Sequence, residues 1–368
     1  MRIGVASILS LAVMHPAWGA DHHAVNVVGA NQYTGSRAQA IIDNAVNTGA
    51  KWVMLGFVWH WSEPFDVTPS PGGWNQFPGV RVSGYHDYRF DAMDYLIPAL
   101  QQRGINVVLG VSGHPTFVGG NTCTTTGGGS PSTWPCGVIR HANKQRFKDY
   151  YYDLLYTMAG RYPGVKHWVI WNEPNLDVYF SPEPPLLYQS PAAEYIDLAM
   201  IPAHSAIRAR IPDATIIGPE IYTCKNTGSG CSNYDHNWGY TTNWLNDWVN
   251  TLLVNWPQYF DKFSIHNYSD DDWGMRNAVG ELWQRMEALN QRKYIWTTEF
   301  NFKNGTCDLT EQTVANLTCK TYKYMTWERA FYFSLNGGCF GLTRDDLTPK
   351  SFLFPAFQSI VAGSYYCQ

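Results

Sequence analysis

Residues 168–175 read Trp-Val-Ile-Trp-Asn-Glu-Pro-Asn (WVIWNEPN), so that an apolar run leads directly into an acid. A short run of large apolar residues is typical of a buried β-strand. No turn residue separates this run from Asn172 and Glu173. The pattern therefore predicts a strand that ends near Trp171, with Glu173 just past its carboxyl end. There it would serve either as part of a helix start or as a reactive group.

Similar apolar runs occur on both sides of this stretch and alternate with longer segments of helical periodicity. The candidate strands are residues 24–29, 52–57, 106–111, 167–171, 215–218, 262–265, 294–298 and 338–342. The candidate helices are residues 36–48, 89–102, 143–161, 192–210, 243–256, 274–291, 312–335 and 354–361. Eight strand-then-helix units predict an α/β fold, a (β/α)8 TIM barrel in a single domain. The alternative, a doubly wound open sheet, usually carries Gly-x-Gly-x-x-Gly after its first strand, and that pattern is absent here.

The connections that follow four of the candidate strands are long and rich in Trp, Gly, Pro and Asn. They comprise residues 59–88, 113–140, 175–191 and 220–242. In barrels of this kind the site forms at the carboxyl ends of the strands, from the loops that follow them. We therefore expect these loops to wall a groove or pocket over the barrel mouth.

A second strand ends in an acid in the same way. Residues 294–301 read YIWTTEFN and place Glu299 at the end of the seventh candidate strand. The fourth and seventh strands lie on opposite sides of the barrel, so Glu173 and Glu299 can face each other across the rim. Such a facing pair, about 5–5.5 Å apart, is what retaining hydrolysis of a glycosidic bond requires. A lone Asn-Glu-Pro favours a helix start, but its pairing with Glu299 favours a catalytic site.

Other polar and aromatic residues are expected on the same rim. The sixth strand ends in His266-Asn267-Tyr268, and a tyrosine beside Glu299 can donate a hydrogen bond that keeps the carboxylate ionised. Asn172 is placed to bond a sugar hydroxyl near the reacting carbon. Glu220 also ends a strand and is expected to support the site or bind sugar. The remaining residues expected to contact substrate are Trp59, Trp61, His114, Trp171 and His266.

The motifs WNEPN and TTEFN, with HNY between them, closely resemble glycoside hydrolase clan A, and most of all its family 39. Residues 88–109 (YRFDAMDYLIPALQQRGINVVL) and 218–220 (GPE) extend the resemblance. It implies that Glu173 is the acid/base and Glu299 the nucleophile, with no cofactor and no metal.

The second strand departs from the clan pattern. Many members place an arginine at the end of this strand, near the nucleophile, but residues 53–61 read VMLGFVWHW here. We expect Trp59, His60 or Trp61 to fill that space.

The amino terminus and the composition indicate export. Residues 1–20 carry Arg2, an apolar run too short to span a bilayer and small residues near a cleavage position, as secretory signals do. We expect residues 21–368 to form one secreted or periplasmic domain without a membrane span. The net charge of −4 offers no basic surface for nucleic acid. The expected partner is a polysaccharide or oligosaccharide, and the expected state is a monomer.

Eight cysteines fit an exported protein and fall into pairs that are close in sequence. The pairs are Cys123/Cys136, Cys224/Cys231, Cys307/Cys319 and Cys339/Cys367. Eight cysteines allow about 105 connectivities, so this pairing is a hypothesis from proximity alone. It predicts that the last pair ties the C-terminus to the eighth strand.

These observations predict a secreted retaining glycoside hydrolase. Two alternatives remain open. One is a transglycosylase that uses the same residues with a sugar in place of water. The other is a non-catalytic carbohydrate-binding barrel, whose mark would be the loss of one of the two acids.

Overall fold

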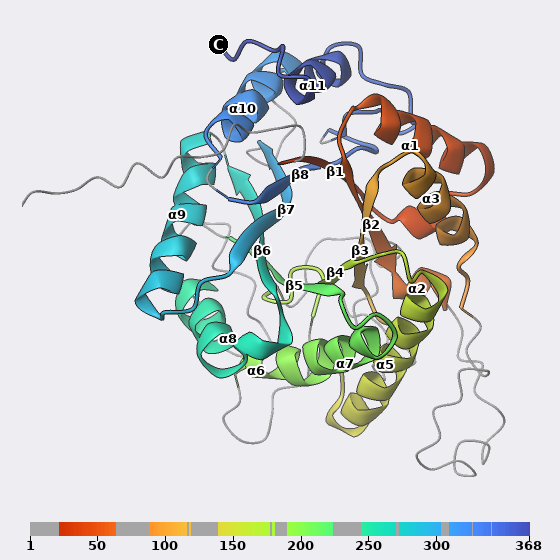
Figure 1. Cartoon of the computed structure of the whole chain (residues 1–368), viewed down its shortest axis with the longest axis vertical. Helices are drawn as coiled ribbons and strands as arrows, with labels where there is room; N and C mark the ends of the chain where they lie inside the picture. The colour runs from red at the N-terminus through yellow and green to blue at the C-terminus, as the bar shows by residue number, and fades with distance from the viewer. Residues whose placement is uncertain are drawn as a thin grey trace, which may run out of the picture.

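The computed structural model describes residues 22–63, 88–115, 118, 139–176, 179–180, 190–223, 244–269, 272–302, 309–325, 327–339 and 341–368. Eight parallel strands close into a barrel in the order in which they occur in the chain (Figure 1). They are β1 (His23–Val27), β2 (Trp52–Val58), β3 (Asn106–Ser112), β4 (His167–Ile170), β5 (Thr215–Tyr222), β6 (Lys262–Ser269), β7 (Tyr294–Phe302) and β8 (Arg329–Phe333). The predicted TIM barrel is confirmed.

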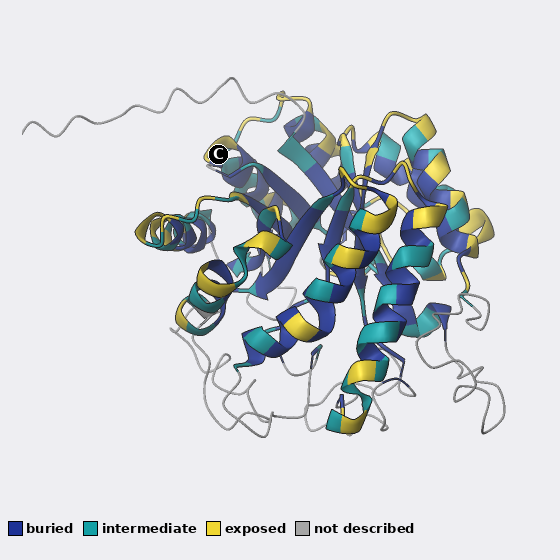
Figure 2. Cartoon of the chain, turned by 60° about the horizontal axis from the view of Figure 1, so that its bottom comes forward, coloured by how far each residue is buried: buried dark blue, intermediate teal, exposed yellow. Residues whose placement is uncertain are grey.

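Helices form the outer layer and turn their apolar faces toward the barrel and their exposed faces to solvent (Figure 2). They are α1 (Gly35–Asn47), α2 (Trp59–Ser62), α3 (Asp91–Gln102), α5 (Lys144–Arg161), α6 (Pro191–Tyr195), α7 (Ile201–Arg210), α8 (Asn250–Asn255), α9 (Asp272–Ala288), α10 (Glu311–Lys323) and α11 (Leu353–Val361). Short π-helical segments, Ile196–Met200 and Trp244–Val249, join α6 to α7 and precede α8.

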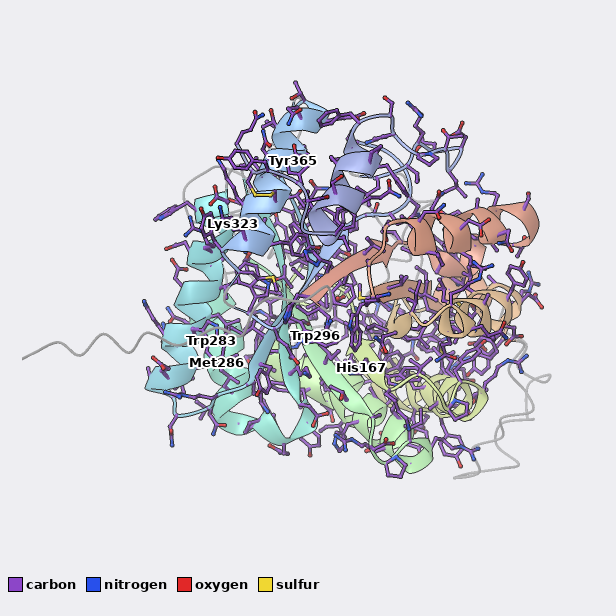
Figure 3. All side chains as sticks on the ribbon, turned by 45° about the horizontal axis from the view of Figure 1, so that its top comes forward. His167, Trp283, Met286, Trp296, Lys323 and Tyr365 are labelled. Atoms are coloured by element: carbon purple, nitrogen blue, oxygen red, sulfur yellow. A yellow bond between two sulfur atoms is a disulfide. The ribbon has the colours of Figure 1, made fainter. Side chains whose placement is uncertain are left out.

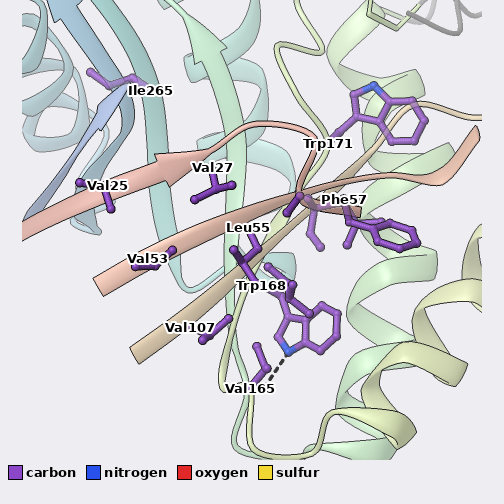
Figure 4. Close-up of a cluster of buried hydrophobic side chains, with 14 of the residues drawn as sticks. Val25, Val27, Val53, Leu55, Phe57, Val107, Val165, Trp168, Trp171 and Ile265 are labelled. Atoms are coloured by element: carbon purple, nitrogen blue, oxygen red, sulfur yellow. Dashed lines mark hydrogen bonds between the residues drawn. The ribbon is translucent and has the colours of Figure 1, made fainter. Parts of the chain in front are cut away.

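The strands are apolar on both faces because each face meets a different part of the core. Alternate side chains of a strand point to opposite sides of the sheet. In β4, Val169 belongs to the cluster inside the barrel, whereas Trp168 packs between the barrel and the helices. The Trp168 ring is fully buried and donates a hydrogen bond from Nε1 to the carbonyl of Val165 (2.9 Å; Figure 4). Burial of each large apolar side chain stabilises the fold by about 1.5–3 kcal/mol.

Aromatic rings close the end of the barrel at which the strands begin. His167 stacks on Trp296 with ring centroids 5.5 Å apart, and both are labelled in Figure 3. The guanidinium of Arg329 lies over the ring of Trp52, with Cζ 3.7 Å from the ring centroid. Trp296 belongs to the cluster that fills the barrel interior. These contacts leave the opposite end, where the strands finish, for the functional site.

The prediction is wrong for the eighth strand. β8 comprises Arg329–Phe333, whereas the sequence pattern places this strand at residues 338–342 and assigns residues 312–335 to one helix. α10 instead ends at its C-cap, Tyr324, and the chain then enters the barrel between β7 and β1. The short apolar run in β8 fits helical periodicity as well as a strand, so periodicity alone cannot find the boundary. In the fold, Phe331 fills the barrel interior.

Two of the four predicted disulfide pairs are wrong. Cys319 is bonded to Cys367, with Cα atoms 5.6 Å apart and 48 positions between them in sequence. After α11 the chain returns to α10, where the Tyr365 hydroxyl donates a hydrogen bond to Asn316 Oδ1 (3.0 Å). Sequence proximity cannot reveal this return. Closing a loop of this length stabilises the fold by about 4 kcal/mol in the chain-entropy description.

Cys339 is also disulfide-bonded, and because Cys319 and Cys367 bond each other, its partner lies outside the described residues. The cysteines outside the described residues are Cys123, Cys136, Cys224, Cys231 and Cys307. The expected signal at residues 1–20 and most of the four long connections also lie outside them. Within the described part of the chain, no helix combines the length and apolarity needed to cross a membrane.

Candidate active site

Glu299 lies inside β7, where a β-bulge turns its side chain toward the barrel mouth. Trp296 points into the barrel, so regular alternation would point Thr298 inward and Glu299 outward. The pairing of β6 with β7 instead skips one residue, from Ile265↔Thr297 to His266↔Glu299. A bulge of this kind inserts one residue and re-aims the side chains that follow it. It therefore places Glu299 on the inner face.

Glu220 reaches the same face by a second bulge. Ile217 points into the barrel interior, and the register between β5 and β6 shifts between Ile217 and Glu220. Glu220 is almost completely buried, with 2% of its surface exposed, and lines the pocket at the barrel mouth. Two of the three acids of the site thus depend on irregular strand pairing.

The third acid, Glu173, is positioned by an unusual backbone just after β4. Trp171 has φ 70° and Glu173 has φ 40°, in the left-handed region that costs a residue other than glycine about 1–3 kcal/mol. Hydrogen bonds hold this backbone in place. The Trp171 amide donates to the Val111 carbonyl (3.0 Å), and the Tyr195 hydroxyl donates to the Ile170 carbonyl (2.6 Å).

Asn175, the last residue of the WNEPN motif, connects the segment after β4 to β5 through two hydrogen bonds. Its side-chain amide donates to the Tyr222 carbonyl (3.0 Å), and its Oδ1 accepts from the Tyr222 amide (2.9 Å). A paired contact of this kind fixes both distance and orientation. We assign Asn175 a structural part in placing Glu173.

The three acids converge on one imidazole. His266 Nδ1 lies 2.9 Å from Glu173 Oε1 and 3.4 Å from Glu299 Oε2. On the other side of the ring, Nε2 lies 3.2 Å from Glu220 Oε1. His266 is fully buried, and Glu173 and Glu299 are 7% and 9% exposed. The structure therefore brings together the two predicted catalytic acids and two of the predicted supporting residues.

Two further side chains donate hydrogen bonds to Glu299. The Tyr268 hydroxyl donates to Oε2 (2.6 Å), as the sequence predicts. Asn26 Nδ2 donates to Oε1 (3.3 Å), a contact that sequence analysis missed. The available signal was a single polar residue inside the apolar first strand, AVNVV. Both donors favour the ionised form of Glu299.

Burial dominates the electrostatics of the site. It raises the pKa of Glu299 to about 8; the positive charge of His266 acts in the opposite direction, and the negative charges of Glu173 and Glu220 raise the pKa further. Burial alone would lower the pKa of His266, but the carboxylates around it raise this pKa well above its usual value. The charge of His266 and the hydrogen bond from Tyr268 thus oppose burial at Glu299, but the pKa of this acid stays above neutral.

Glu173, His266 and Glu299 also have the residue types of a metal site, with one potential ligand atom of each within 4.8 Å of the others. The donor set does not fit a metal ion. Both nitrogens of His266 already face carboxylate oxygens, and a metal requires a neutral imidazole with a free lone pair. The arrangement is that of a network of ion pairs and hydrogen bonds.

A pocket of about 400 Å³, counting the space at its mouth, opens beside the acids. One wall consists of Trp171, Asn172, Glu220 and Glu299. The opposite wall comes from β1–β3 and the turn after β1, and includes Val28, Gly29, Gly56, Val58, Gly110 and Ser112, with Met54 below. The space arises where the strands carry small side chains or none.

The structure separates the aromatic residues expected to bind substrate. Trp171 and Asn172 line the pocket, and the ring of Trp61 lies against Gly29, which also lines it. Trp59 is fully buried and donates from Nε1 to Glu63 (2.7 Å), so its face is not available to a sugar. The expectation that Trp59 contacts substrate is therefore wrong.

His114 is also removed from direct contact with the pocket. It is 2% exposed and stacks behind Trp171, with ring centroids 6.1 Å apart. Trp171 packs in turn on the aromatic residues of α5, and Figure 4 shows its ring directed away from the strands toward the helices. His114 thus supports the wall that Trp171 forms.

This fold and this cluster of acids define a barrel of the glycosidase class. A model of the family described as the glycosyl hydrolase catalytic core matches residues 143–346, more than half of the chain. The match includes Glu173, Glu220, His266 and Glu299. The chain belongs to this glycosyl hydrolase family.

Several solved structures share the fold. A family 39 glycoside hydrolase from Bacteroides cellulosilyticus is 15% identical, with a TM-score of 0.59 over 94% of this chain and 63% of that one. A monomeric β-xylosidase from Caulobacter crescentus is 15% identical (TM-score 0.63; 93% and 68% covered). An endoglucanase from Thermotoga maritima is 14% identical (TM-score 0.53; 91% and 96% covered).

The chain thus spans less than two thirds of the family 39 structure. No curated protein sequence matches it.

Proposed function

We propose that the protein is a retaining glycoside hydrolase that cleaves a poly- or oligosaccharide by double displacement. The spacing of the acids carries this proposal. One carboxylate oxygen of Glu173 lies within 4.8 Å of one carboxylate oxygen of Glu299. Retaining enzymes hold their two carboxyl groups about 5–5.5 Å apart, whereas inverting enzymes need about 6.5–9.5 Å to admit a water molecule. The short spacing favours a covalent intermediate.

In the first step, Glu299 attacks the anomeric carbon while the bond to the leaving oxygen breaks. Glu173 donates its proton to that oxygen, so the leaving sugar departs as a neutral alcohol. Tyr268 and Asn26 both donate hydrogen bonds to Glu299 and none to Glu173 among the described contacts. They favour the microstate with the proton on Glu173, which is the one this step needs.

In the second step, a water molecule attacks the anomeric carbon and the bond to Glu299 breaks. Glu173, now ionised, accepts the proton of the water and regains the state in which it began. Two displacements at one carbon return the original anomeric configuration. No atom outside the acids, the sugar and water takes part in either step.

The pocket indicates an uncharged sugar. Among the described residues, its charged lining consists of Glu220 and Glu299, which would repel a uronic acid and accept hydrogen bonds from hydroxyl groups. The hollow along Gly56 and Gly110 gives the ring or its substituents room beside the nucleophile. Trp61, whose ring lies against Gly29, supplies aromatic surface at its edge.

A transglycosylase would use the same residues with a sugar hydroxyl in place of water. Nothing in the described geometry favours it, and product analysis at high substrate separates the two, since transfer yields products longer than the substrate. The presence of both acids weighs against a non-catalytic barrel.

The test is incubation with a panel of polysaccharides and aryl glycosides, with product size and anomeric configuration read by NMR before the anomers equilibrate. We expect shortened products that first appear in the configuration of the substrate. Inverted product would overturn the retaining mechanism. Binding of a glycan without turnover, equal in the wild type and Glu299→Gln, would identify a carbohydrate-binding barrel instead.

We also propose that the protein is exported and acts as a monomer. The signal-like sequence of residues 1–20 and the disulfide between Cys319 and Cys367 support export. The monomeric β-xylosidase from Caulobacter crescentus, which shares the fold, supports the second point. Amino-terminal sequencing of the protein recovered from its host tests the first point, with Asp21 expected near the start. Light scattering of the purified protein tests the second.

A further inference from the structure

The His266 ring is held between carboxylates on both sides. Nδ1 faces Glu173 (2.9 Å) and Glu299 (3.4 Å), and Nε2 faces Glu220 (3.2 Å). The ring has no exposed surface. The backbone of His266 is fixed as well, because its carbonyl accepts hydrogen bonds from both the amide and the hydroxyl of Thr223 (3.0 and 2.9 Å).

This geometry favours the protonated form of the ring. A neutral imidazole carries one N–H and one lone pair, so one nitrogen would present its lone pair to a buried carboxylate oxygen. The protonated ring carries an N–H on both sides and a positive charge among three acids: Nδ1 makes a hydrogen bond to Glu173, and Nε2 lies at ion-pair distance (3.2 Å) from Glu220. The direction of the electrostatic shift agrees, because the surrounding carboxylates raise the pKa of His266 well above its usual value.

We propose that Glu220 is a positioning residue that keeps the His266 ring doubly protonated and oriented between Glu173 and Glu299. This inference rests on the proposed function for its catalytic consequence, but not for its geometry. Glu220 is the acid on the Nε2 side, away from the two predicted catalytic acids. The bulge in β5 directs its side chain inward to this place.

The doubly protonated ring has a chemical consequence for Glu173. A ring without a lone pair cannot accept a proton, so the proton of Glu173 has the leaving oxygen as its acceptor. The Nδ1–H donor also orients Glu173. Within the described ranges, the ionisable groups that face the ring are Glu173 after β4, Glu220 on β5 and Glu299 on β7, while Tyr268 on its own strand faces Glu299.

The test measures the ring directly and needs no turnover. Protein labelled with ¹⁵N at histidine is titrated by NMR between about pH 5 and pH 9, a range that spans the usual pKa of histidine. The His266 signal is assigned by its loss in His266→Gln. We expect a doubly protonated ring through neutral pH in the wild type. In Glu220→Gln we expect its pKa to fall by about 1 to 3 pH units, the effect of losing one adjacent opposite charge.

Glu194→Gln is the matched control. Glu194 is also buried (3% exposed) and paired, with Lys144 Nζ at 2.8 Å, but it lies on α6 outside the pocket lining. Its replacement should leave the His266 signal unchanged. Glu220→Asp keeps the charge and should retain the doubly protonated ring. It can be measured in place of Glu220→Gln if that variant does not fold.

A second measurement is the pH dependence of kcat/KM on any substrate that the protein cleaves. In Glu220→Gln its alkaline limb should move to lower pH together with the pKa of His266. A wild-type ring that is neutral at neutral pH would overturn the proposal, and so would a folded Glu220→Gln whose ring stays doubly protonated. A rise in KM with an unchanged ring signal would make Glu220 a substrate ligand instead. Absence of turnover would refute only the proposed function.

Discussion

The two halves of the barrel mouth differ in what they contribute to the site: one supplies ionisable groups and the other supplies space. The half formed by β4–β7 carries ionisable groups, namely Glu173, Glu220, His266, Tyr268 and Glu299. The half formed by β1–β3 and the turn after β1 contributes space, through Gly29, Gly56, Gly110 and Ser112. We refer to these as the acid half and the glycine half.

The backbones of the two halves differ in the same way. β2 and β3 pair without interruption from Trp52↔Asn106 to Val58↔Ser112. In the acid half, both the β5–β6 and β6–β7 pairings are shifted, and Trp171 and Glu173 have left-handed backbones. Glu220 and Glu299 reach the inner face through these shifts, because regular alternation after Ile217 and Trp296 would point both outward. A hollow requires only that side chains be small.

The largest effect is expected when the proposed nucleophile of the acid half is removed. Glu299→Gln should lower turnover by more than about a thousandfold, since loss of a covalent nucleophile removes the main reaction path. The fold and sugar binding should persist, because glutamine has nearly the same shape. Steady-state kinetics and glycan binding measure both. The control, Glu287→Gln, changes an exposed glutamate that pairs with Arg292. Retention of a tenth of the activity would place the nucleophile elsewhere.

Glu173→Ala should reveal a smaller loss that depends on the leaving group. A general acid contributes about a hundred- to ten-thousandfold, but an activated aryl leaving group hardly needs the proton. We expect the first step to survive on an aryl glycoside and to fail on the natural glycan. Azide should restore the second step, since an anion needs no base. Equal losses on both substrates, with no effect of azide, would contradict the assignment.

The role of the glycine half is tested by placing a larger side chain in its hollow. A Cβ at Gly110 would lie 3.7 Å from Met54 Sδ, an ordinary contact, so Gly110→Ala should fold normally while a methyl group enters the pocket. If sugar occupies this hollow, kcat/KM should fall by about 10- to 200-fold, the cost of one misfitting methylene.

Gly280→Ala on α9, where an added Cβ meets nothing within 4 Å, provides the matched control and should retain full activity. Unchanged kinetics in a folded Gly110→Ala would show that the substrate does not reach the hollow. The measurement is steady-state kinetics together with the affinity for a bound product.

The sequence predicts the order of the elements and the convergence of the acids, because both follow from apolar runs and from the place where each run meets a polar residue. It does not predict the bulges. The patterns end the fifth and seventh strands at residues 218 and 298, whereas both continue past their acids, to Tyr222 and Phe302. A β-bulge is a property of the pairing between two strands. The sequence of one strand alone therefore does not reveal it.

The glycine half escaped prediction for a related reason. Gly56 and Gly110 lie side by side in register, and only this pairing turns two isolated glycines into one hollow. The departure from the clan pattern in the second strand does point to this region. Of the three residues expected to fill the space, Trp59 faces the core, whereas the ring of Trp61 lies against Gly29 at the pocket. Periodicity assigned β8 to a helix because a short apolar run serves either structure.

The two halves should also differ in how they link stability to pH. In the folded protein the pKa of Glu299 is raised from 4.5 to about 8, so between these values the folded state holds a proton that the unfolded chain has released. This stabilising contribution is complete below about pH 4.5 and is lost as the pH rises toward 8. His266, whose pKa is raised above 6.5, acts in the same direction.

We therefore expect the free energy of unfolding to fall by about 1.4 kcal/mol per pH unit for each such proton as the pH rises through this range. Denaturant unfolding measured at several pH values gives the slope. Glu299→Gln removes the carboxyl group whose pKa is raised and its charge beside Glu173, so its slope should be shallower. Gly110→Ala, which alters only the glycine half, should keep the wild-type slope. Equal slopes in wild type and Glu299→Gln would show that the buried acids hold no extra proton in the folded state.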